Sequence, residues 1–546
     1  MNALIFFFVL LSAQLRAGAS YEAPPAGRIA GVVVNAVTNA PVPRAEVSIV
    51  LENQELSIKT GADGRFQFDA LKAAKYQLYA SAPGYIREGY NQHGTFFTGI
   101  AVGTGFDSEH LAFRLHPQAL IYGRVTDDYG DPVRNAAVQI VVSGISGGTR
   151  GGAFQNQTQT DDLGEYRFAH LVAGKYRVAV QTRPWYSQPG LNFQSEQPRD
   201  QPYARWLNST PPKPDPRLDV VYPVTFYPGV SDPHAATELN LSAGATEQAN
   251  IPLHAVPAVH VRLRNLPLEE NGVSIGASQP TFGNSQVGMP VVIGRVSPGE
   301  YEVAGLPPGQ TIFQITRNVG GEQVPETLIA EISGDDTLDA ARTGPSANLS
   351  GRLITAQPVP CVEAAHVMLV GENQSASTTL RKDCSFSIPG VQAGTYKVQM
   401  APLFGGEFIQ SLRVSGAHSS GSQITIDRSG DVQLTITMGA GFAYVSGVAK
   451  LADKAFDGAM ILAVPASGEN LEDDFRMDQS DSDGTFALYN VIPGKYFLVA
   501  IRDGWDLDWR DPQVLKPYLE KAMPLQFGSG ETKQVTVEVQ PTKKTP

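Results

Sequence analysis

Apolar and polar side chains alternate with a period of two along many short stretches of this chain. Ala45, Val47 and Ile49 are separated by polar residues, and Phe66 and Phe68 flank a glutamine. Successive side chains of a β-strand point to opposite faces, so such stretches are expected to form strands with one buried and one solvated face. Similar stretches follow one another over nearly the whole chain, separated by Gly, Pro, Asn and Asp residues. The pattern predicts an all-β protein.

The alternating stretches belong to a unit that recurs along the chain. Three segments, which begin at Thr60, Thr160 and Ser480, read TGADGRFQFDALKAAKYQLYASAPGY, TDDLGEYRFAHLVAGKYRVAV and SDSDGTFALYNVIPGKYFLVA. In each segment a glycine stands twelve residues before a tyrosine, and the spacing returns twice more with one residue changed. The glycines are expected in tight turns that require a positive φ, and the tyrosines on the buried face of a strand. The five pairs are Gly64 and Tyr76, Gly164 and Tyr176, Gly299 and Thr311, Cys384 and Tyr396, and Gly484 and Tyr496.

A second shared phrase lies upstream of four of these segments and predicts two strands joined by a turn. In the third unit its counterpart, near AVHVRLRNLPLEENGVSIGAS, is degenerate. The four clear copies are GRIAGVVVNAVTNAPVPRAEVSIV from Gly27, ALIYGRVTDDYGDPVRNAAVQIVV from Ala119, ANLSGRLITAQPVPCVEAAHVMLV from Ala347 and AYVSGVAKLADKAFDGAMILAV from Ala443.

The combined pattern of turn, glycine and tyrosine positions resembles the carboxypeptidase regulatory-like domain. The resemblance implies a transthyretin-like (prealbumin-type) fold, a seven-stranded, Ig-like antiparallel β-sandwich related to Cna-B-type stalk modules and to starch-binding-like sandwiches. Because the last strand of each unit runs directly into the first strand of the next, we expect a semi-rigid string of sandwiches. The expected sandwiches span residues 27–117, 118–255, 256–344, 345–440 and 441–541.

Composition and charge narrow the classes of partner. The chain has 546 residues with 54 Gly and 39 Pro, which favours many turns over long helices. Its net charge is −12 and no basic run is longer than Lys543–Lys544, so nucleic acid is not an expected partner. Residues 1–19 have the short apolar run and small-residue ending of a secretory signal peptide, and no later segment is apolar enough to span a membrane. We expect an exported protein that is periplasmic, secreted or associated with the cell envelope.

The chain contains only two cysteines, Cys361 and Cys384. In an exported protein they are expected to form a disulfide. Cys361 aligns with Pro41, in the loop between the first two strands of the unit, and Cys384 aligns with Gly64, in a later turn. These two loops emerge at the same end of an up-and-down sandwich, so the two sulfur atoms are expected to meet.

No catalytic pattern withstands inspection. None of the nine histidines begins a His-x-x-Glu or His-Glu-x-x-His pattern, which a zinc peptidase needs. GISGG at residues 144–148 matches G-x-S-x-G, but it lies in a Gly-rich stretch that predicts a hairpin rather than the strand-turn-helix of a nucleophile elbow. Asp481 and Asp483 could bind calcium, although an aspartate before a glycine is also what a hairpin turn favours. We expect no enzymatic activity and assign no cofactor or metal site.

Two aromatic-rich segments depart from the repeat. One is a Pro-rich insertion in the second unit, residues 184–231, and the other is the loop DGWDLDWRDP in the fifth unit. Exposed rings beside carboxylates could bind the faces and hydroxyl groups of sugars, or the rings could cap the open ends of the sandwiches. The candidate ligand-binding residues are Trp185, Tyr186 and Trp206 in the insertion and Trp505, Asp506, Asp508 and Trp509 in the loop.

These features favour a non-catalytic, exported binding module whose ligand is a carbohydrate or cell-surface glycan. Part of the basis is the resemblance in fold and part is the aromatic loops. The alternative is a structural stalk or adaptor, or a protein–protein interaction scaffold in the bacterial cell envelope, held there by an envelope protein.

Overall fold

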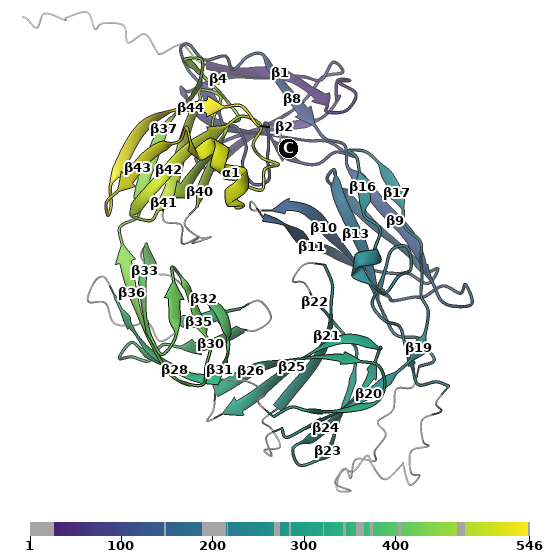
Figure 1. Ribbon diagram of the computed structural model, residues 1–546. Helices are drawn as coiled ribbons and strands as arrows, with labels where there is room; N and C mark the ends of the chain where they lie inside the picture. Colours follow the sequence, from purple (N-terminus) through teal and green to yellow (C-terminus); the bar gives the residue numbers. More distant parts are fainter. Residues whose placement is uncertain are drawn as a thin grey trace, which may run out of the picture.

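Five β-sandwiches follow one another along the chain in the computed structural model (Figure 1). The structure describes residues 27–543 apart from 147–148, 188–214, 216, 267–272, 283–285, 320–321, 342–345, 356–364, 372–374, 402–405 and 467–474. Each sandwich encloses a hydrophobic core of its own. The predicted all-β fold of tandem sandwiches is therefore confirmed, and the units are called sandwich 1 to sandwich 5 in chain order.

The first sheet of every sandwich has the same centre. Its opening strand pairs antiparallel with the strand that follows the repeat turn (at Gly64, Gly164, Gly299, Cys384 or Gly484) and parallel with the closing strand of the unit. The strands of these sheets are β1 (Gly27–Asn35), β4 (Arg65–Leu71) and β8 (Leu111–Leu115); β9 (Ala119–Thr126), β12 (Glu165–Leu171), β17 (Thr246–Gln248) and β18 (Ile251–Pro252); β20 (Val259–Arg264), β23 (Val292–Ser297), β24 (Glu300–Leu306) and β27 (Asp336–Asp339); β28 (Ser346–Ile354), β31 (Ser385–Gln392), β33 (Glu407–Ser415) and β36 (Gly430–Ala440); and β37 (Ala443–Leu451), β38 (Lys454–Ala455), β41 (Thr485–Val491) and β44 (Thr532–Gln540).

The second sheet of every sandwich contains the strand that follows the Pro-Gly or Ala-Gly turn. In sandwich 5, β44 also pairs with a strand of this second sheet, so the two sheets are continuous there. The strands are β2 (Glu46–Leu51), β3 (Gln54–Lys59), β5 (Ala74–Ser81), β6 (Glu88–Gly89) and β7 (Ile100–Val102); β10 (Ala137–Ser146), β11 (Thr149–Gln159), β13 (Gly174–Gln181), β15 (Thr225–Phe226) and β16 (Leu239–Leu241); β21 (Val273–Pro280), β22 (Gln286–Gly288), β25 (Gly309–Val319) and β26 (Glu322–Ile332); β29 (His366–Val370), β30 (Ser375–Thr379), β32 (Gly394–Ala401), β34 (His418–Ser420) and β35 (Gln423–Ile426); and β39 (Met460–Pro465), β40 (Arg476–Gln479), β42 (Gly494–Ile501) and β43 (Met523–Phe527).

A few elements lie outside the two sheets of the unit. The short strands β14 (Val220–Val221) and β19 (Val256–Pro257) pair between sandwiches 2 and 3. A 3₁₀ turn spans Pro233–Ala235, and the helix α1 spans Pro512–Leu519 in sandwich 5. No helix in the described part of the chain is both long enough and apolar enough to cross a bilayer.

In four sandwiches the opening strand carries a glycine at the same position. The sheet register places this glycine opposite an inward-facing aromatic ring, and the neighbouring closing strand leaves no room for a side chain. A Cβ atom on Gly31 would lie 2.2 Å from the carbonyl oxygen of Leu111, and one on Gly123 would lie 2.0 Å from that of Ala249. The closing strand therefore approaches too closely for any side chain at this position. The four pairs are Gly31 and Phe66, Gly123 and Tyr166, Gly351 and Phe386, and Gly447 and Phe486.

The degenerate third unit keeps the same backbone. In all five sandwiches a β-bulge interrupts the pairing at the same point, where two residues of one strand lie opposite one residue of the other. Leu263 stands at the glycine position of sandwich 3, opposite Tyr301. Residues with positive φ mark the bulge in each copy, namely Ala70, His170, Gly305, Gly390 and Asn490.

The turn and tyrosine positions have the conformations that the repeat predicts. The turn residues Gly64, Gly164, Gly299 and Gly484 have positive φ, and Cys384, at φ 63°, adopts the same conformation. The repeated tyrosines are buried. Three of them donate a hydrogen bond to the carbonyl oxygen four residues earlier: Tyr76 to Lys72 at 3.2 Å, Tyr176 to Val172 at 2.8 Å and Tyr396 to Gln392 at 2.8 Å.

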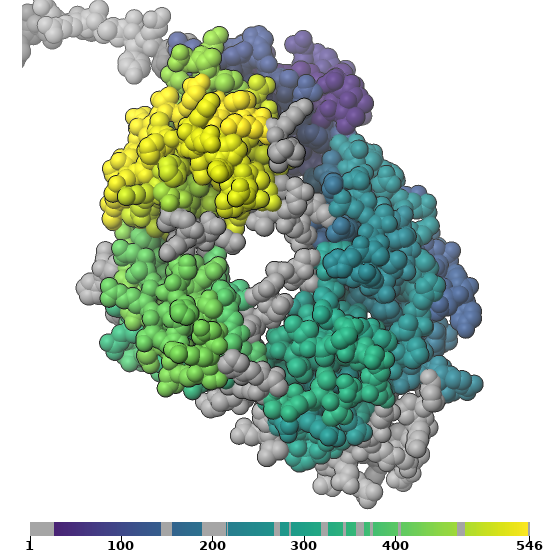
Figure 2. All heavy atoms as spheres, viewed as in Figure 1, coloured from purple at the N-terminus to yellow at the C-terminus, as the bar shows by residue number. Residues whose placement is uncertain are grey.

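The row of sandwiches curves back on itself. Figure 1 shows sandwich 5, in yellow, against sandwich 1, in purple, and the space-filling view in Figure 2 shows an opening at the centre. The expected string of sandwiches is present, and its two ends meet. The sequence did not predict this contact, which joins residues about four hundred positions apart.

Candidate functional site

Sandwich 1 and sandwich 5 meet through the DSDG turn that the sequence offered as a calcium site. The Asp481 carboxylate pairs with the Lys75 ammonium at 2.7 Å and accepts a hydrogen bond from the Gly99 N–H at 2.8 Å. The Ser482 hydroxyl accepts from the Ala101 N–H at 2.8 Å, and the Ser482 N–H donates to the Gly99 carbonyl at 2.9 Å. The turn therefore binds the backbone of the neighbouring sandwich rather as an added strand would.

Gln479 occupies the centre of this contact and is only 2% exposed. Its side-chain NH₂ donates to the Asn91 carbonyl at 2.7 Å and to the Thr98 hydroxyl at 2.8 Å. Its amide oxygen lies 3.0 Å from Nδ1 of His93. An amide oxygen only accepts, so this nitrogen carries the hydrogen. A buried amide with partners on both ends contributes specificity, because any other arrangement would leave a polar group unsatisfied.

Trp505 completes the contact with an aromatic stack. Its ring lies parallel to that of His93, with centroids 4.9 Å apart and planes at 6°, and it also contacts Phe96 at 5.8 Å. Its indole N–H donates to the Gly458 carbonyl at 3.3 Å. The closing contact comprises Lys75, His93, Thr98, Gly99 and Ala101 of sandwich 1 and Gln479, Asp481, Ser482 and Trp505 of sandwich 5.

Two carboxylates have shifted pKa values here, Asp481 in the closing contact and Asp478 beside it in sandwich 5. Burial, opposed by the hydrogen bond from Ala487, raises the pKa of Asp478 to about 6. Burial also raises the pKa of Asp481, although the Lys75 ammonium opposes the rise. The pKa of Lys75 is itself raised, because its pairing with Asp481 outweighs the effect of burial. Lys75 is therefore the cation that makes this acidic turn tolerable inside a contact.

The remaining residues of the Trp505 loop belong to the packing of sandwich 5. Trp509 is 5% exposed and lies 5.2 Å from the ring of Phe475. With Leu515 and Tyr518 of α1 it covers the outer face of the second sheet. Asp506 is exposed and Asp508 is partly buried. Trp509 is therefore buried, and Trp505 stacks on His93 across the contact with sandwich 1.

The insertion candidates lie elsewhere. Trp185 is 89% exposed, and its ring stands perpendicular to that of Tyr186 at 5.8 Å. Trp206 lies outside the described residues. Burial raises the pKa of Tyr186, and the neighbouring Asp128 adds to the rise. Trp185 and Tyr186 belong to sandwich 2, whereas Trp505 and Trp509 belong to sandwich 5.

Three further expectations from the sequence concern the cysteines, the Gly-rich stretch and metal binding. Cys384 is disulfide-bonded, and the one other cysteine of the sequence, Cys361, lies outside the described residues. Strands β10 and β11 pair through to Ser146, which places the Gly-rich stretch in a hairpin. Over the described ranges, no group of three or more His, Cys, Asp or Glu residues is arranged to hold a metal ion.

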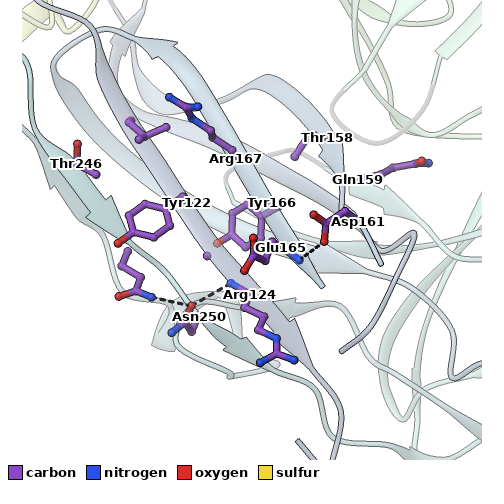
Figure 3. Close-up of a pocket in the computed structure, with 13 residues that line it drawn as sticks. Tyr122, Arg124, Thr158, Gln159, Asp161, Glu165, Tyr166, Arg167, Thr246 and Asn250 are labelled. Carbon is purple, nitrogen blue, oxygen red and sulfur yellow. Dashed lines mark hydrogen bonds between the residues drawn. The ribbon is translucent and has the colours of Figure 1, made fainter. Parts of the chain in front are cut away.

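A groove of 740 Å³ lies on the first sheet of sandwich 2 (Figure 3). Strand β9 alternates buried and accessible residues, so Tyr122 and Arg124 point away from the core. Tyr122 stands between Arg167 of β12 and Gln248 of β17 in the sheet register. The groove is lined by Leu120, Tyr122, Gly123, Arg124, Thr158, Gln159, Asp161, Glu165, Tyr166, Arg167, Thr246, Gln248 and Asn250.

Sandwiches 2 and 3 share a buried histidine. His260 is 4% exposed, with Nδ1 at 2.9 Å from Glu302 and Nε2 at 2.7 Å from Asp219 of the preceding sandwich. Carboxylates accept hydrogen bonds, so both ring nitrogens donate and the imidazole is charged. Burial lowers the pKa of His260, but the hydrogen bonds to Glu302 and Asp219 outweigh it, and the net pKa is raised.

Sequence reasoning missed most of these residues. The DSDG turn was singled out. Lys75 stands before the repeat tyrosine, as Lys175 and Lys495 do in two other copies, so the sequence does not distinguish it, and His93 and Gln479 belong to no motif. Tyr122 carried a stronger signal, since an aromatic residue stands there before the repeat glycine where the other clear copies have Ala30, Ser350 and Ser446.

Residues 28–109 and 121–198 match the carboxypeptidase regulatory-like domain. No curated protein matches the chain. Solved structures with similar local folds include a streptococcal ancillary pilin (10% identity, 58% of this chain and 100% of that chain, TM-score 0.18). Two others are the minor pilin of Streptococcus agalactiae (10%, 42% and 96%, TM-score 0.20) and the full-length major pilin of Streptococcus pneumoniae (8%, 93% and 99%, TM-score 0.17).

Such low TM-scores mean that the pilins do not share the overall arrangement of this chain, and they carry no argument about its function. The family match is different, because it falls on two units whose repeat glycine, turn and tyrosine have been described above. It begins one residue inside β1 and, in the second copy, within β9. Sandwiches 1 and 2 therefore each contain a segment that matches the carboxypeptidase regulatory-like domain.

Proposed function

We propose that this protein is a non-catalytic scaffold that holds partner proteins on a closed frame of five sandwiches. The observation that carries the proposal is the closing contact. A chain of sandwiches linked only in sequence can bend at each joint, whereas a closed frame fixes every sandwich from two sides. Surfaces that are already fixed lose less conformational freedom when a partner binds.

The hydrogen bonds of the closing contact allow sandwiches 1 and 5 to associate in one defined orientation. Its centre is the buried amide of Gln479 and the turn at Asp481, and each uses backbone groups of the other sandwich. Groups of this kind tolerate only one register. We propose that the frame acts in the cell envelope of a bacterium after export, in line with the signal peptide expected at residues 1–19.

A carbohydrate ligand at the Trp505 loop receives less support than the scaffold. Trp509 is packed under α1, and Trp505 stacks on His93. Both rings serve contacts within the protein.

The test is to open the frame without unfolding a sandwich. Lys75→Ala combined with Gln479→Ala removes the ammonium and the buried amide from the closing contact. Small-angle scattering of the full chain should then give a larger radius of gyration. In cells, cross-links from the wild-type protein to its partners should be lost in this double variant.

The matched control is Lys72→Ala with Gln526→Ala, which removes an exposed lysine and an exposed glutamine from the same two sandwiches. It should keep both the compact scattering profile and the cross-links. Cross-links that survive in a chain shown by scattering to be open would refute the closed frame as the functional form.

A further inference from the structure

We propose that the groove on the first sheet of sandwich 2 binds a neutral oligosaccharide. The groove lies on strands β9, β12 and β17, apart from the closing contact and apart from the Trp505 loop. Its volume, 740 Å³, falls within the range of about 300–1,000 Å³ typical of small-molecule sites. The proposal is independent of the scaffold function, because no residue of the closing contact lines the groove.

The repeat itself marks this sheet as different. The strand register makes Ala30, Tyr122, Ser350 and Ser446 equivalent, because each precedes the glycine that lies opposite an aromatic residue. Three of these residues are small. Only Tyr122, which is 39% exposed, places a ring on the outer face at this position. A large, partly exposed ring that the fold does not need is free to serve a ligand.

The groups around Tyr122 suit a sugar. A pyranose ring has an apolar face of C–H bonds that can lie on an aromatic ring, and its hydroxyl groups both donate and accept hydrogen bonds. Beside Tyr122 stand the guanidinium of Arg167 and the amide of Gln248, and an amide offers a donor and an acceptor together. Asn250 is already engaged, since its oxygen accepts from the Arg124 N–H at 3.0 Å (Figure 3).

Several of the lining groups are open to a ligand. Among the described residues, the Tyr122 hydroxyl, the Arg167 guanidinium and the Thr246 hydroxyl make no side-chain hydrogen bond or ion pair within the protein. Tyr166, by contrast, points inward, and its hydroxyl donates to the Ala249 carbonyl at 2.5 Å. The floor of the groove is therefore fixed by the fold, while the rim retains unused hydrogen-bonding capacity.

Charge decides which class of sugar fits. Two arginines, Arg124 and Arg167, and two acids, Asp161 and Glu165, line the groove, so the site has little net charge. The chain as a whole carries −12, which disfavours an anionic glycan. A neutral polymer of hexose or pentose units needs no excess of charge in the groove and is not repelled by the negative charge of the chain.

The proposal is tested by titrating the full chain with four neutral hexasaccharides, built from glucose, mannose, xylose or N-acetylglucosamine. At least one should bind, and Tyr122→Ala should weaken that binding by about tenfold or more. Tyr122→Phe keeps the ring and should retain most of the affinity. It also serves as a folding control, since the ring lies outside the core. Binding should be nearly unchanged in 1 M salt, because neutral ligands are not screened.

Tyr129→Ala is the matched control, as it removes an 83% exposed tyrosine from the same sandwich outside the groove. It should leave affinity unchanged, as should the double variant that opens the frame. Failure of all four sugars to bind, or equal binding by wild type and Tyr122→Ala, would overturn the proposal. Capture of a protein at this face, abolished by Tyr122→Ala while no sugar binds, would overturn it in favour of a protein partner.

Discussion

Two contacts between sandwiches differ in chemistry. The joint between sandwiches 2 and 3 is largely apolar, whereas the closing contact between sandwiches 1 and 5 is largely polar. The joint has an apolar cluster around Phe226 and Phe282, whose rings meet at 4.9 Å in an edge-to-face arrangement. Beside it lies the buried, charged His260. The closing contact has one aromatic stack, and the rest of its contacts are hydrogen bonds and an ion pair.

This difference follows from how each contact must form. Sandwiches 2 and 3 are adjacent in the chain and meet as soon as they fold, so a large apolar surface between them is never long exposed. Sandwiches 1 and 5 meet only after three others are in place. A polar contact there is soluble while open, and it still specifies one register when closed. The joint should therefore be strong, and the closing contact weaker and more responsive to conditions.

The largest expected effect is at the joint. His260→Ala would leave Glu302 and Asp219 without the cation between them, and removing one partner of a buried ion pair costs about 3–5 kcal/mol. Native-state hydrogen exchange in increasing urea should be faster at the Val224 amide, which donates to Gln279 of sandwich 3 across the joint. If this amide exchanges as slowly as in the wild type, the joint does not depend on this histidine.

The hydrophobic cores of the sandwiches should be equally sensitive to the loss of the repeat tyrosine, although the contacts between sandwiches differ. Tyr176→Ala in sandwich 2 and Tyr496→Ala in sandwich 5 each remove a buried ring and should destabilise their own sandwich by at least about 3 kcal/mol. Similar losses in the two melting curves would place the difference in the contacts rather than in the sandwiches. Phe106→Ala, at a side chain that is 48% exposed, is the control and should change little.

Sandwich 5, next to the closing contact, and the joint should lose stability in different pH windows. The pKa of Asp478 is about 6 in the folded protein, against 3.8 for an ordinary aspartate, so its stabilisation is full below pH 3.8 and is lost as pH rises through about 6. The loss is about 2–3 kcal/mol in sandwich 5. The pKa of His260 is raised above 6.5, so the joint keeps its stabilisation below pH 6.5 and loses it at higher pH.

Stability of the full chain at pH 4, 5, 6, 7 and 8 tests this prediction, with hydrogen exchange at the Ala487 amide, which donates to Asp478, as the probe of sandwich 5. Asp478→Asn can still accept the Ala487 N–H, which lies 2.7 Å away, and it should abolish the lower window alone. A variant that changes both windows, or neither, would contradict the assignment.

The smallest expected effect is that of salt. The Lys75 and Asp481 side chains are 44% and 23% exposed, and a pair this accessible contributes about 0–1 kcal/mol that salt screens. In 1 M salt the Gly99 and Ala101 amides, which donate across the closing contact, should exchange faster. The Val224 amide, which donates across the joint, should not. Equal responses would mean that the two contacts are not electrostatically different.

The alternation of residues such as Ala45, Val47 and Ile49 was enough to predict strands, because burial of one face is a local property of the pleat. The glycine, turn and tyrosine positions were also legible, since a close approach of backbones or a positive φ restricts which residue can stand there. Cys384 in the turn position illustrates this, as its conformation is that of the glycines it replaces.

The residues of the candidate site could be predicted less well from the sequence. Trp505 and Trp509 are conspicuous in the sequence, and their composition alone could not tell an exposed ring from one stacked on His93 or covered by α1. Lys75 shares its place before the repeat tyrosine with Lys175 and Lys495, and Tyr122 differs from its counterparts only in being aromatic, whereas Gln479 belongs to no motif. Their roles depend on which strand lies next to them, and a period of two residues does not contain that information.

The sequence by itself determined that a β-sandwich is repeated five times, because each copy encodes its own core and turns within about a hundred residues. The tertiary structure decided that the ends of the row meet and that one outer sheet face carries a groove. Both depend on the angles at successive joints and on contacts between residues hundreds of positions apart. Small differences in the angle between neighbouring sandwiches add up over the five units, and the total cannot be predicted from any local pattern of side chains.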